Sequence, residues 1–581
     1  MNEYCNPLDL PYRFQHYGKT AHREAADPTL IYFKEMYYLF PSMTAGFFYG
    51  KDLFHWQYHE NRNLEIYHYA PDVRQIGDYM YFCASDRNTP CKILRSRNPL
   101  DDDFEEVSAP FDFWDPDMFC DDDGRVYLYW GCGNREPIWG IEMDPKTMLP
   151  IGTKKAMLDQ DKEKHGWERF NFPGKEEVSR QSRGLFIHLI MKQLNKSGRP
   201  YMEGAFMTKI NGRYYLQYAA PGTQYPVYGD GYYVGDSPLG PFSFAPNTPF
   251  SLKPGGFITG AGHGSTIFDT FGNLWHIATM RISVNQDMER RVGLFPAGVD
   301  EDGLLFCNQN FADYPIVIPD GKFDPKEILP HYMLLSYRKK VTASSSIEGH
   351  PAELAVDENI RDWWCADGGA GESFTLDLGK IYMPHSLQIN FAEEKIPVKH
   401  MPKDQCSQSM ATGKRYIDTD PSLHTRFTVE GSTDGQTYQM LFDCSSIDSD
   451  QSHPYLLFKE NTSVRYLKFT AIELPYHSNF ALSGVRVFGL DDGEKPAKIS
   501  EAAAELTEDR LSARLTWNPA EDAVGYNIRF GIAPDKLYHS WMVYDANELL
   551  ITTLNADQKY WFCIDSFNES GVTEGAVFSA E

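Results

Sequence analysis

The sequence predicts an all-β protein in which a five-bladed β-propeller is followed by two β-sandwich domains. Aromatic residues make up 14% of the 581 residues, and aromatic side chains favour β-sheets. One strand pattern repeats through the first half of the chain, and two different strand patterns follow it in the second half. A chain of this length exceeds what one hydrophobic core can hold, so about three domains are expected.

The repeat in the first half has five copies. Each copy has a polar residue among small neighbours, then a short apolar strand, a turn and a Tyr-rich strand. Asn211-Gly212 is one of four such turns whose residues tolerate positive φ, which indicates a tight β-hairpin. Because a four-stranded unit repeated five times forms a propeller, we predict one over residues 1–325. The copies begin at Asp27, Asp72, Asp115, Glu203 and His263.

A long segment separates the third copy from the fourth. It extends from Trp139 to Pro200 and contains Trp167 and Arg169. Long inserted loops in compact domains often carry function. We therefore expect this segment to wall one side of a site on the propeller.

The innermost strand of every blade is predicted to begin at the same position of the repeat. The leading side chains would then converge on the propeller axis at one end and bring three or four acids into one small volume. Like charges held together raise the pKa of at least one of them. A neutral acid beside an ionised base is the pair that glycoside hydrolysis requires.

At these positions the sequence resembles glycoside hydrolase family 43, whose members are five-bladed propellers that invert the anomeric configuration. The resemblance spans about residues 5–320, and its motifs occur in blade order. They are Ala26-Asp27-Pro28, Ala70-Pro71-Asp72, Trp114-Asp115-Pro116, Glu203-Gly204 and Gly262-His263-Gly264-Ser265.

The resemblance implies a role for each of three acids. Asp27 is the expected general base that deprotonates a water, and Glu203 is the expected general acid that protonates the leaving oxygen. Asp115 is the expected third acid, which orients Glu203. Inversion requires a gap of about 6.5 to 9.5 Å between the base and the acid, enough to seat the water.

Two further residues are implied by the same resemblance. His263 matches a position that in many members faces the central cavity and binds a calcium ion or its waters, although a lone histidine is commonly a satisfied interior group. Arg291 matches the active-site arginine of the family, with Arg290 and Arg281 as competing candidates.

Asp72, Trp114 and Trp167 are expected to contact the substrate. For Asp72 the alternative is a structural role at its strand. For the two tryptophans, a platform for a sugar ring and ordinary core packing are both open.

The second half of the chain contains the two predicted sandwiches. Residues 334–490 resemble a discoidin-like (factor V/VIII type C) domain, a type that often binds sugars. Asp357 with neighbouring carbonyls is a candidate structural calcium site there. Residues 497–581 resemble a fibronectin type III domain. The first resemblance rests on segments such as Val341-Thr-Ala-Ser, Trp363-Trp364 and Phe374-Thr-Leu-Asp-Leu-Gly, and the second on Leu515-Thr-Trp-Asn-Pro and Gly525-Tyr-Asn-Ile-Arg.

Charge and composition limit the partners. The formal net charge of −26 opposes binding to nucleic acid and to anionic lipid surfaces. Apolar stretches of membrane-spanning length are absent, and residues 1–10 lack the regions of a signal peptide. The spacing of the ten cysteines matches no disulfide framework, so most are expected to be free. We expect a monomer without an organic cofactor, and the resemblance implies a secreted or periplasmic location.

The resemblance implies release of a terminal pentose, α-L-arabinofuranose or β-D-xylose, from plant polysaccharide or oligosaccharide. An exo-β-galactosidase on the same scaffold is one alternative. A catalytically inactive carbohydrate-binding or adhesion protein is another, and two appended sandwiches would suit it.

Overall fold

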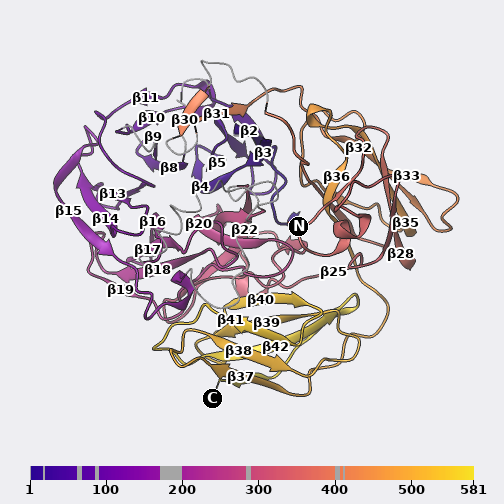
Figure 1. Ribbon diagram of the computed structural model, residues 1–581. Coiled ribbons are helices and arrows are strands. Elements are labelled where there is room, and N and C mark those ends of the chain that lie inside the picture. Colours follow the sequence, from indigo (N-terminus) through magenta and orange to yellow (C-terminus); the bar gives the residue numbers. More distant parts are fainter. Residues whose placement is uncertain are drawn as a thin grey trace.

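The computed structural model describes residues 2–17, 20–61, 64, 69–85, 90–169, 199–282, 289–398, 406–409 and 413–580. The regular elements in these ranges are β-strands and short 3-10 helices. The predicted fold class is confirmed, because a five-bladed β-propeller is followed by two β-sandwiches (Figure 1). None of the described helices is long and apolar enough to cross a membrane.

Five four-stranded antiparallel sheets form the propeller, and each is built from consecutive segments of the chain. Blade 1 comprises β4 (Ala26–Phe33), β5 (Met36–Ser42), β6 (Gly46–Gly50) and β7 (Gln57–Glu60). Blade 2 comprises β8 (Tyr69–Ile76), β9 (Tyr79–Ser85), β10 (Leu94–Ser96) and β11 (Glu105–Glu106). Blade 3 comprises β12 (Asp117–Cys120), β13 (Val126–Trp130), β14 (Ile138–Met143) and β15 (Pro150–Leu158).

The last two blades follow the long insertion. Blade 4 comprises β16 (Glu203–Ile210), β17 (Arg213–Ala220), β18 (Gly229–Gly235) and β19 (Phe242–Phe244). Blade 5 comprises β20 (Thr259–Phe268), β21 (Leu274–Arg281), β22 (Arg290–Val299) and β23 (Leu305–Cys307). Every residue of β21 is buried, because the strand lies inside its own sheet and also packs against β4 of blade 1.

Tight turns join the first two strands of the blades. Asn211 (φ 51°) and Gly212 (φ 80°) join β16 to β17, as predicted. Blade 1 uses Lys34 (φ 47°) and Glu35 (φ 64°) instead, a turn that no glycine marks in the sequence. Two successive left-handed residues give the turn a twist that matches the twist of the strands.

The long segment between the third and fourth repeats contains more sheet than expected. Strands β14 and β15 occupy residues 138–143 and 150–158, so the segment predicted from Trp139 begins as the outer half of blade 3. Residues 159–169 then pack against the C-terminal sandwich, where the Gly166 N–H donates to the carbonyl of Leu554 at 2.8 Å. Residues 170–198 lie outside the described residues.

Two sheets enclose the core of the first sandwich. Along β28 (Ser373–Tyr382), Phe374, Leu376 and Leu378 are buried and alternate with more exposed residues, as in a sheet with one face toward a core. One sheet is β25 (Met333–Leu334), β36 (Ala481–Gly489), β29 (Ser386–Phe391) and β34 (Tyr455–Leu457), with β27 (Trp364–Cys365) beside β36. The other is β26 (Lys340–Ala343), β28, β35 (Val464–Glu473), β32 (Arg426–Ser432) and β33 (Gln439–Asp443).

The second sandwich has sheets of three and five strands around Trp517 and Tyr526, whose rings lie 5.2 Å apart. The smaller sheet is β37 (Ala502–Leu506), β38 (Ala513–Trp517) and β41 (Glu548–Ile551). The larger is β40 (His539–Tyr544), β39 (Gly525–Gly531), β42 (Trp561–Asn568) and β43 (Gly571–Thr573), with β44 (Val577–Ser579) beside β42.

One further sheet joins the propeller to the first sandwich. The N-terminal hairpin, β2 (Arg13–Tyr17) and β3 (Thr20–Glu24), pairs through β2 with β31 (Gly413–Asp418), which pairs in turn with β30 (Cys406–Ser409). Figure 1 shows β30 and β31 lying beside the N-terminal strands. The domain limits 1–325, 334–490 and 497–581 stay predictions, and this sheet combines strands from the first two ranges.

Candidate active site

The inner strands β4, β8, β16 and β20 carry a β-bulge near their start. In blade 3 the residues just before β12 follow the same course, because the Gly131 N–H donates to the Trp114 carbonyl at 2.8 Å and Asp117 pairs with Tyr129. In blade 1, Ala26 pairs with Ser42 and Thr29 pairs with Phe40, so two residues oppose one. The first bulge residue is left-handed, a conformation that glycine adopts easily and other residues rarely. These residues are Asp27 (φ 49°), Ala70 (47°), Asp115 (48°), Gly204 (63°) and His263 (49°).

The predicted common register is correct for Asp27, Asp115 and His263 and wrong for Asp72 and Glu203. Glu203 directly precedes its bulge residue, and Asp72 lies two residues after its own. A bulge inserts an extra residue into one strand. A pattern of polar and small residues therefore cannot locate its position to within one or two residues.

Hydroxyl groups of the preceding blade hold the backbone of three bulges. In each case the bulge N–H donates a hydrogen bond to a serine or threonine at the end of the second strand. The pairs are Asp27 with Thr279 at 2.7 Å, Ala70 with Ser42 at 2.7 Å, and Asp115 with Ser85 at 3.2 Å. The N–H of His263 donates to Asp230 Oδ1 at 2.7 Å instead. These bonds fix the bulges, and with them the direction of the side chains.

Asp27 is a buried carboxylate that faces positive and hydroxyl donors. Ser42 Oγ donates to its Oδ2 at 2.9 Å and Arg290 Nη1 to its Oδ1 at 3.1 Å. His263 Nδ1 lies 3.4 Å from the same Oδ1. Arg290 also donates to Glu24 Oε1 at 2.9 Å. This contact set suits an anionic acceptor.

Glu203 is partly exposed and its two oxygens have different partners. Tyr228 donates a hydrogen bond to Oε1 at 2.6 Å. Within the described part of the chain, Oε2 is contacted by Cys132 Sγ, a weak donor, at 3.6 Å. Cys132 Sγ also lies 2.9 Å from the hydroxyl of Tyr201. Tyr228 thereby fixes the position of one of the two carboxylate oxygens.

Asp115 and His263 complete the cluster. The pKa of Asp115 is raised to about 7, chiefly by burial; the charges of Glu203 and Asp27 contribute to the rise, and His263 opposes it. Burial alone would lower the pKa of His263, but the carboxylates of Asp27, Asp115 and Glu203 leave it above its usual value. Oxygens of Asp115 and Glu203 and a ring nitrogen of His263 all lie within 4.8 Å of one another.

Residues 21–305 match the family model described as Glycosyl hydrolases family 43. Those residues form a family 43 domain. They contain the five inner strands and every acid described above.

Known proteins resemble parts of this chain. A β-xylosidase of Xylanibacter ruminicola is 27% identical over 146 residues, which cover 22% of this chain and 39% of the relative. A β-D-galactofuranosidase of Aspergillus niger is 29% identical over 154 residues, 26% of this chain and 44% of the relative. The chain thus spans less than half the length of these relatives. A crystal structure of a thermostable family-43 glycoside hydrolase is 22% identical with a TM-score of 0.40, covering 55% of this chain and 100% of that chain.

Asp72 has a structural position in the family 43 domain. Its Oδ2 accepts a hydrogen bond from the Met118 N–H of blade 3 at 2.7 Å, and Asp117 Oδ2 accepts the Met207 N–H of blade 4 in the same way at 2.7 Å. Asp72 is 1% exposed. The expectation that Asp72 binds substrate is therefore corrected, because its carboxylate joins two blades.

The two candidate tryptophans differ. Trp114 is half-buried next to Asp115, where a sugar platform remains a prediction. Trp167 is 0% exposed and packs in the core with Tyr218, at a ring distance of 5.3 Å. The expectation for Trp167 is wrong, because a side chain without exposed surface offers no face to a ligand.

Arg291 does not contact the acids. It is fully buried, and its Nε donates to His453 Nε2 of the first sandwich at 2.8 Å. Arg290 takes the position at Asp27 that was expected for Arg291. Successive side chains of a strand point to opposite faces, so a shift of one residue exchanges the two roles.

Tyr228 and Cys132 were not predicted from the sequence. Both lie outside the repeated position, and neither has a neighbouring motif. Only the assembled blades bring them to Glu203.

The predicted calcium near His263 stays a prediction. The three clustered groups meet the distance requirement for a metal ion, but they offer two carboxylates and one imidazole. Calcium prefers about six to eight oxygen ligands. This donor set therefore fits calcium poorly.

Proposed function

We propose that this protein hydrolyses a terminal glycosidic bond with inversion, with Asp27 as general base and Glu203 as general acid. The observation that carries the proposal is the contrast between the two carboxylates around His263. Asp27 accepts hydrogen bonds from Arg290 and Ser42, whereas Glu203 accepts one from Tyr228 at Oε1 and, from the described residues, a weak one from Cys132 at Oε2. Opposite roles require this difference in surroundings.

In the proposed reaction Asp27 takes a proton from a water that attacks the anomeric carbon. Glu203 gives its Oε2 proton to the leaving oxygen on the opposite side, so each turnover moves one proton through each carboxyl group. Asp115 and His263 lie beside Glu203 and set the local charge. A base–acid gap of about 6.5 to 9.5 Å, which accommodates the water, is part of this proposal.

We propose a terminal pentose, α-L-arabinofuranose or β-D-xylose, of plant polysaccharide as the substrate. The β-xylosidase similarity supports β-D-xylose. The β-D-galactofuranosidase similarity favours a second candidate, a terminal hexofuranose. An exo-β-galactosidase and an inactive binding protein are the remaining alternatives.

The test is a panel of nitrophenyl arabinofuranoside, xyloside, galactofuranoside and galactoside, with the anomer of the first product followed by NMR. For Glu203→Gln we expect a loss of about 10²- to 10⁴-fold on oligosaccharides, because general acid catalysis contributes that much. The loss on nitrophenyl glycosides should be much smaller, because nitrophenolate leaves without protonation.

Glu142→Gln is the matched control, because Glu142 is a partly buried glutamate on β14, an outer strand of blade 3. It should leave both activities unchanged. Full activity of Glu203→Gln on oligosaccharides, or a product that retains its configuration, would overturn the mechanism.

A further inference from the structure

A second cavity lies where the propeller meets both sandwiches. Its volume is about 560 Å³, within the usual range for sites that bind small molecules. The propeller contributes Tyr225 and Arg281, the first sandwich Asn359 and Arg361, and the second sandwich Trp541 and Tyr544. We propose that this junction cavity binds a stretch of the substrate glycan remote from the bond that is cleaved. The inference rests on the proposed glycosidase function.

The junction cavity lies at the same end of the propeller as the acids. Arg281 of its lining pairs across the sheet with Arg290, whose guanidinium contacts Asp27. Residues 225–228 form a turn in which the Tyr228 N–H donates to the Tyr225 carbonyl at 3.1 Å. The hydroxyl of Tyr228 donates a hydrogen bond to Glu203. Two elements therefore connect the cavity directly to the candidate base and acid.

Trp541 offers the flat apolar face that a sugar ring requires. It is partly exposed and packs against a cluster of Tyr225, Val227 and Leu252. A Cβ at Gly255 would lie 2.5 Å from its ring, so the indole rests directly on the propeller backbone and is held in place. An aromatic ring that is already ordered loses little entropy when a ligand stacks on it.

Polar groups around the ring supply hydrogen-bonding capacity. Asn359 is exposed, and the guanidinium groups of Arg281 and Arg361 belong to the lining. Arg281 is buried and donates through Nη1 to the Gln224 carbonyl at 2.6 Å. The carboxylate among the described lining residues, Glu358, is paired with Arg486 at 2.9 Å. A lining of aromatic faces, amide groups and arginine donors fits the hydroxyl-rich surface of a neutral oligosaccharide.

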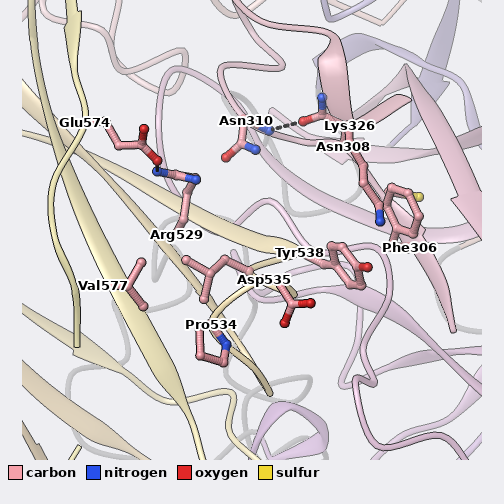
Figure 2. Close-up of a pocket in the computed structure, with 12 residues that line it drawn as sticks. Phe306, Asn308, Asn310, Lys326, Arg529, Pro534, Asp535, Tyr538, Glu574 and Val577 are labelled. Carbon is pink, nitrogen blue, oxygen red and sulfur yellow. Dashed lines mark hydrogen bonds and ion pairs between the residues drawn. The ribbon is translucent and has the colours of Figure 1, made fainter. Parts of the chain in front are cut away.

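Another cavity, between blade 5 and the second sandwich, is smaller. Its volume is about 220 Å³, and its arginine is already paired with acids. Figure 2 shows Arg529 facing Glu574, to which it donates at 2.7 Å, and Arg529 also donates to Asp565 at 2.6 Å. The guanidinium thereby bonds both acids of the Cys563, Asp565 and Glu574 cluster, whose ligand atoms lie close enough together for a metal ion.

The test compares a small substrate with a polymer in the full-length protein. For Trp541→Ala we expect kcat/KM on nitrophenyl glycoside to stay within about twofold, since that substrate does not reach the junction cavity. On soluble arabinoxylan, which carries both candidate pentoses, kcat/KM should fall about tenfold, mainly through KM, as for a lost contact of about 1.4 kcal/mol. Arg361→Ala, from the other sandwich, should act in the same direction.

Trp561→Ala is the matched control, because Trp561 is also partly exposed in the second sandwich and lies outside the cavity lining. It should leave kcat/KM unchanged on both the nitrophenyl glycoside and arabinoxylan. Binding is measured separately by gel retardation in arabinoxylan with Glu203→Gln, with and without Trp541→Ala, and the second change should abolish retardation.

The possible failures are distinguishable. The cavity proposal would be overturned if Trp541→Ala and Arg361→Ala both left the polymer kinetics and the retardation unchanged. Normal turnover of nitrophenyl glycosides in the same variants would leave the glycosidase proposal intact. Absence of turnover on every glycoside, with retardation that depends on Trp541, would reject the glycosidase and support the cavity. Absence of arabinoxylan retardation in Glu203→Gln itself would also overturn the cavity proposal.

Discussion

At the residue scale, two adjacent arginines on one strand have unrelated surroundings. Arg290 contacts Asp27 and Glu24 in the propeller. Arg291 points to the other face, where it bonds His453 and the carbonyl of Arg23. Side chains alternate between the two faces of a strand. Arg290 therefore lies at the acids, and Arg291 lies at the contact with the first sandwich.

This separation predicts opposite effects for two matched substitutions. Arg290→Lys should lower kcat/KM on nitrophenyl glycosides about tenfold or more, because lysine cannot reproduce the planar contacts to two carboxylates. Arg291→Lys should lower the melting temperature with kcat/KM within about twofold. Steady-state kinetics and calorimetry on both variants test these two expectations. Equal losses of activity would contradict the assignment of Arg290 to the active site and Arg291 to the interdomain contact.

At the residue scale, the positions that the sequence predicts are those that recur in the repeat. Asp27, Asp115 and His263 could be predicted because each occupies the bulge position of its blade. Tyr228 and Cys132 could not, because they belong to connections that differ between blades.

At the element scale, the bulge is the unit that repeats. It forces a left-handed backbone on four residues other than glycine, which costs about 1 to 2 kcal/mol for an ordinary L-residue. Aspartate tolerates this conformation better than alanine. In blade 4 the bulge residue is Gly204, where a Cβ would lie 2.7 Å from the ring of His263. Glycine there provides both the backbone and the space for the histidine.

Ala70 carries the backbone cost without a functional side chain. We expect Ala70→Gly to raise the free energy of unfolding by up to about 1 kcal/mol, because relief of the left-handed strain exceeds the added entropy of the unfolded chain. Ala205→Gly is the control, because Ala205 is a buried alanine of β16 whose φ is not left-handed. It should lower the free energy of unfolding by about 0.5 to 1 kcal/mol. Urea denaturation measures both, and a destabilised Ala70→Gly would refute the strain argument.

At the scale of the whole molecule, buried ion pairs join the propeller to the first sandwich. Arg23 of β3 bonds both oxygens of Asp450, at 2.6 and 2.7 Å, and Glu393 at 2.6 Å. The N-terminal hairpin is also paired with β31. Such contacts couple the two parts into one unit, because separating them would leave buried charges without partners.

Asp450→Asn should therefore destabilise the whole protein by about 3 to 5 kcal/mol, as expected when one partner of a buried pair loses its charge. Asp448→Asn is the control, because Asp448 pairs with Arg426 at 2.9 Å with 86% of its side chain exposed. Such surface pairs contribute about 0 to 1 kcal/mol. Differential scanning calorimetry should show a lowered transition only for Asp450→Asn. Similar melting temperatures for the two variants would show that the junction is not a stabilising contact.

The sequence by itself determined the fold class, the number of blades and the candidate catalytic acids Asp27, Asp115 and Glu203. Local patterns predict those features, namely the turn residues, the alternation along strands and a motif that recurs with each blade. Tertiary structure alone decided which arginine meets Asp27, that Asp72 joins blades, that Trp167 is core, and that three domains share one cavity. These features depend on bulge register and on contacts between residues hundreds of positions apart, which no local pattern encodes.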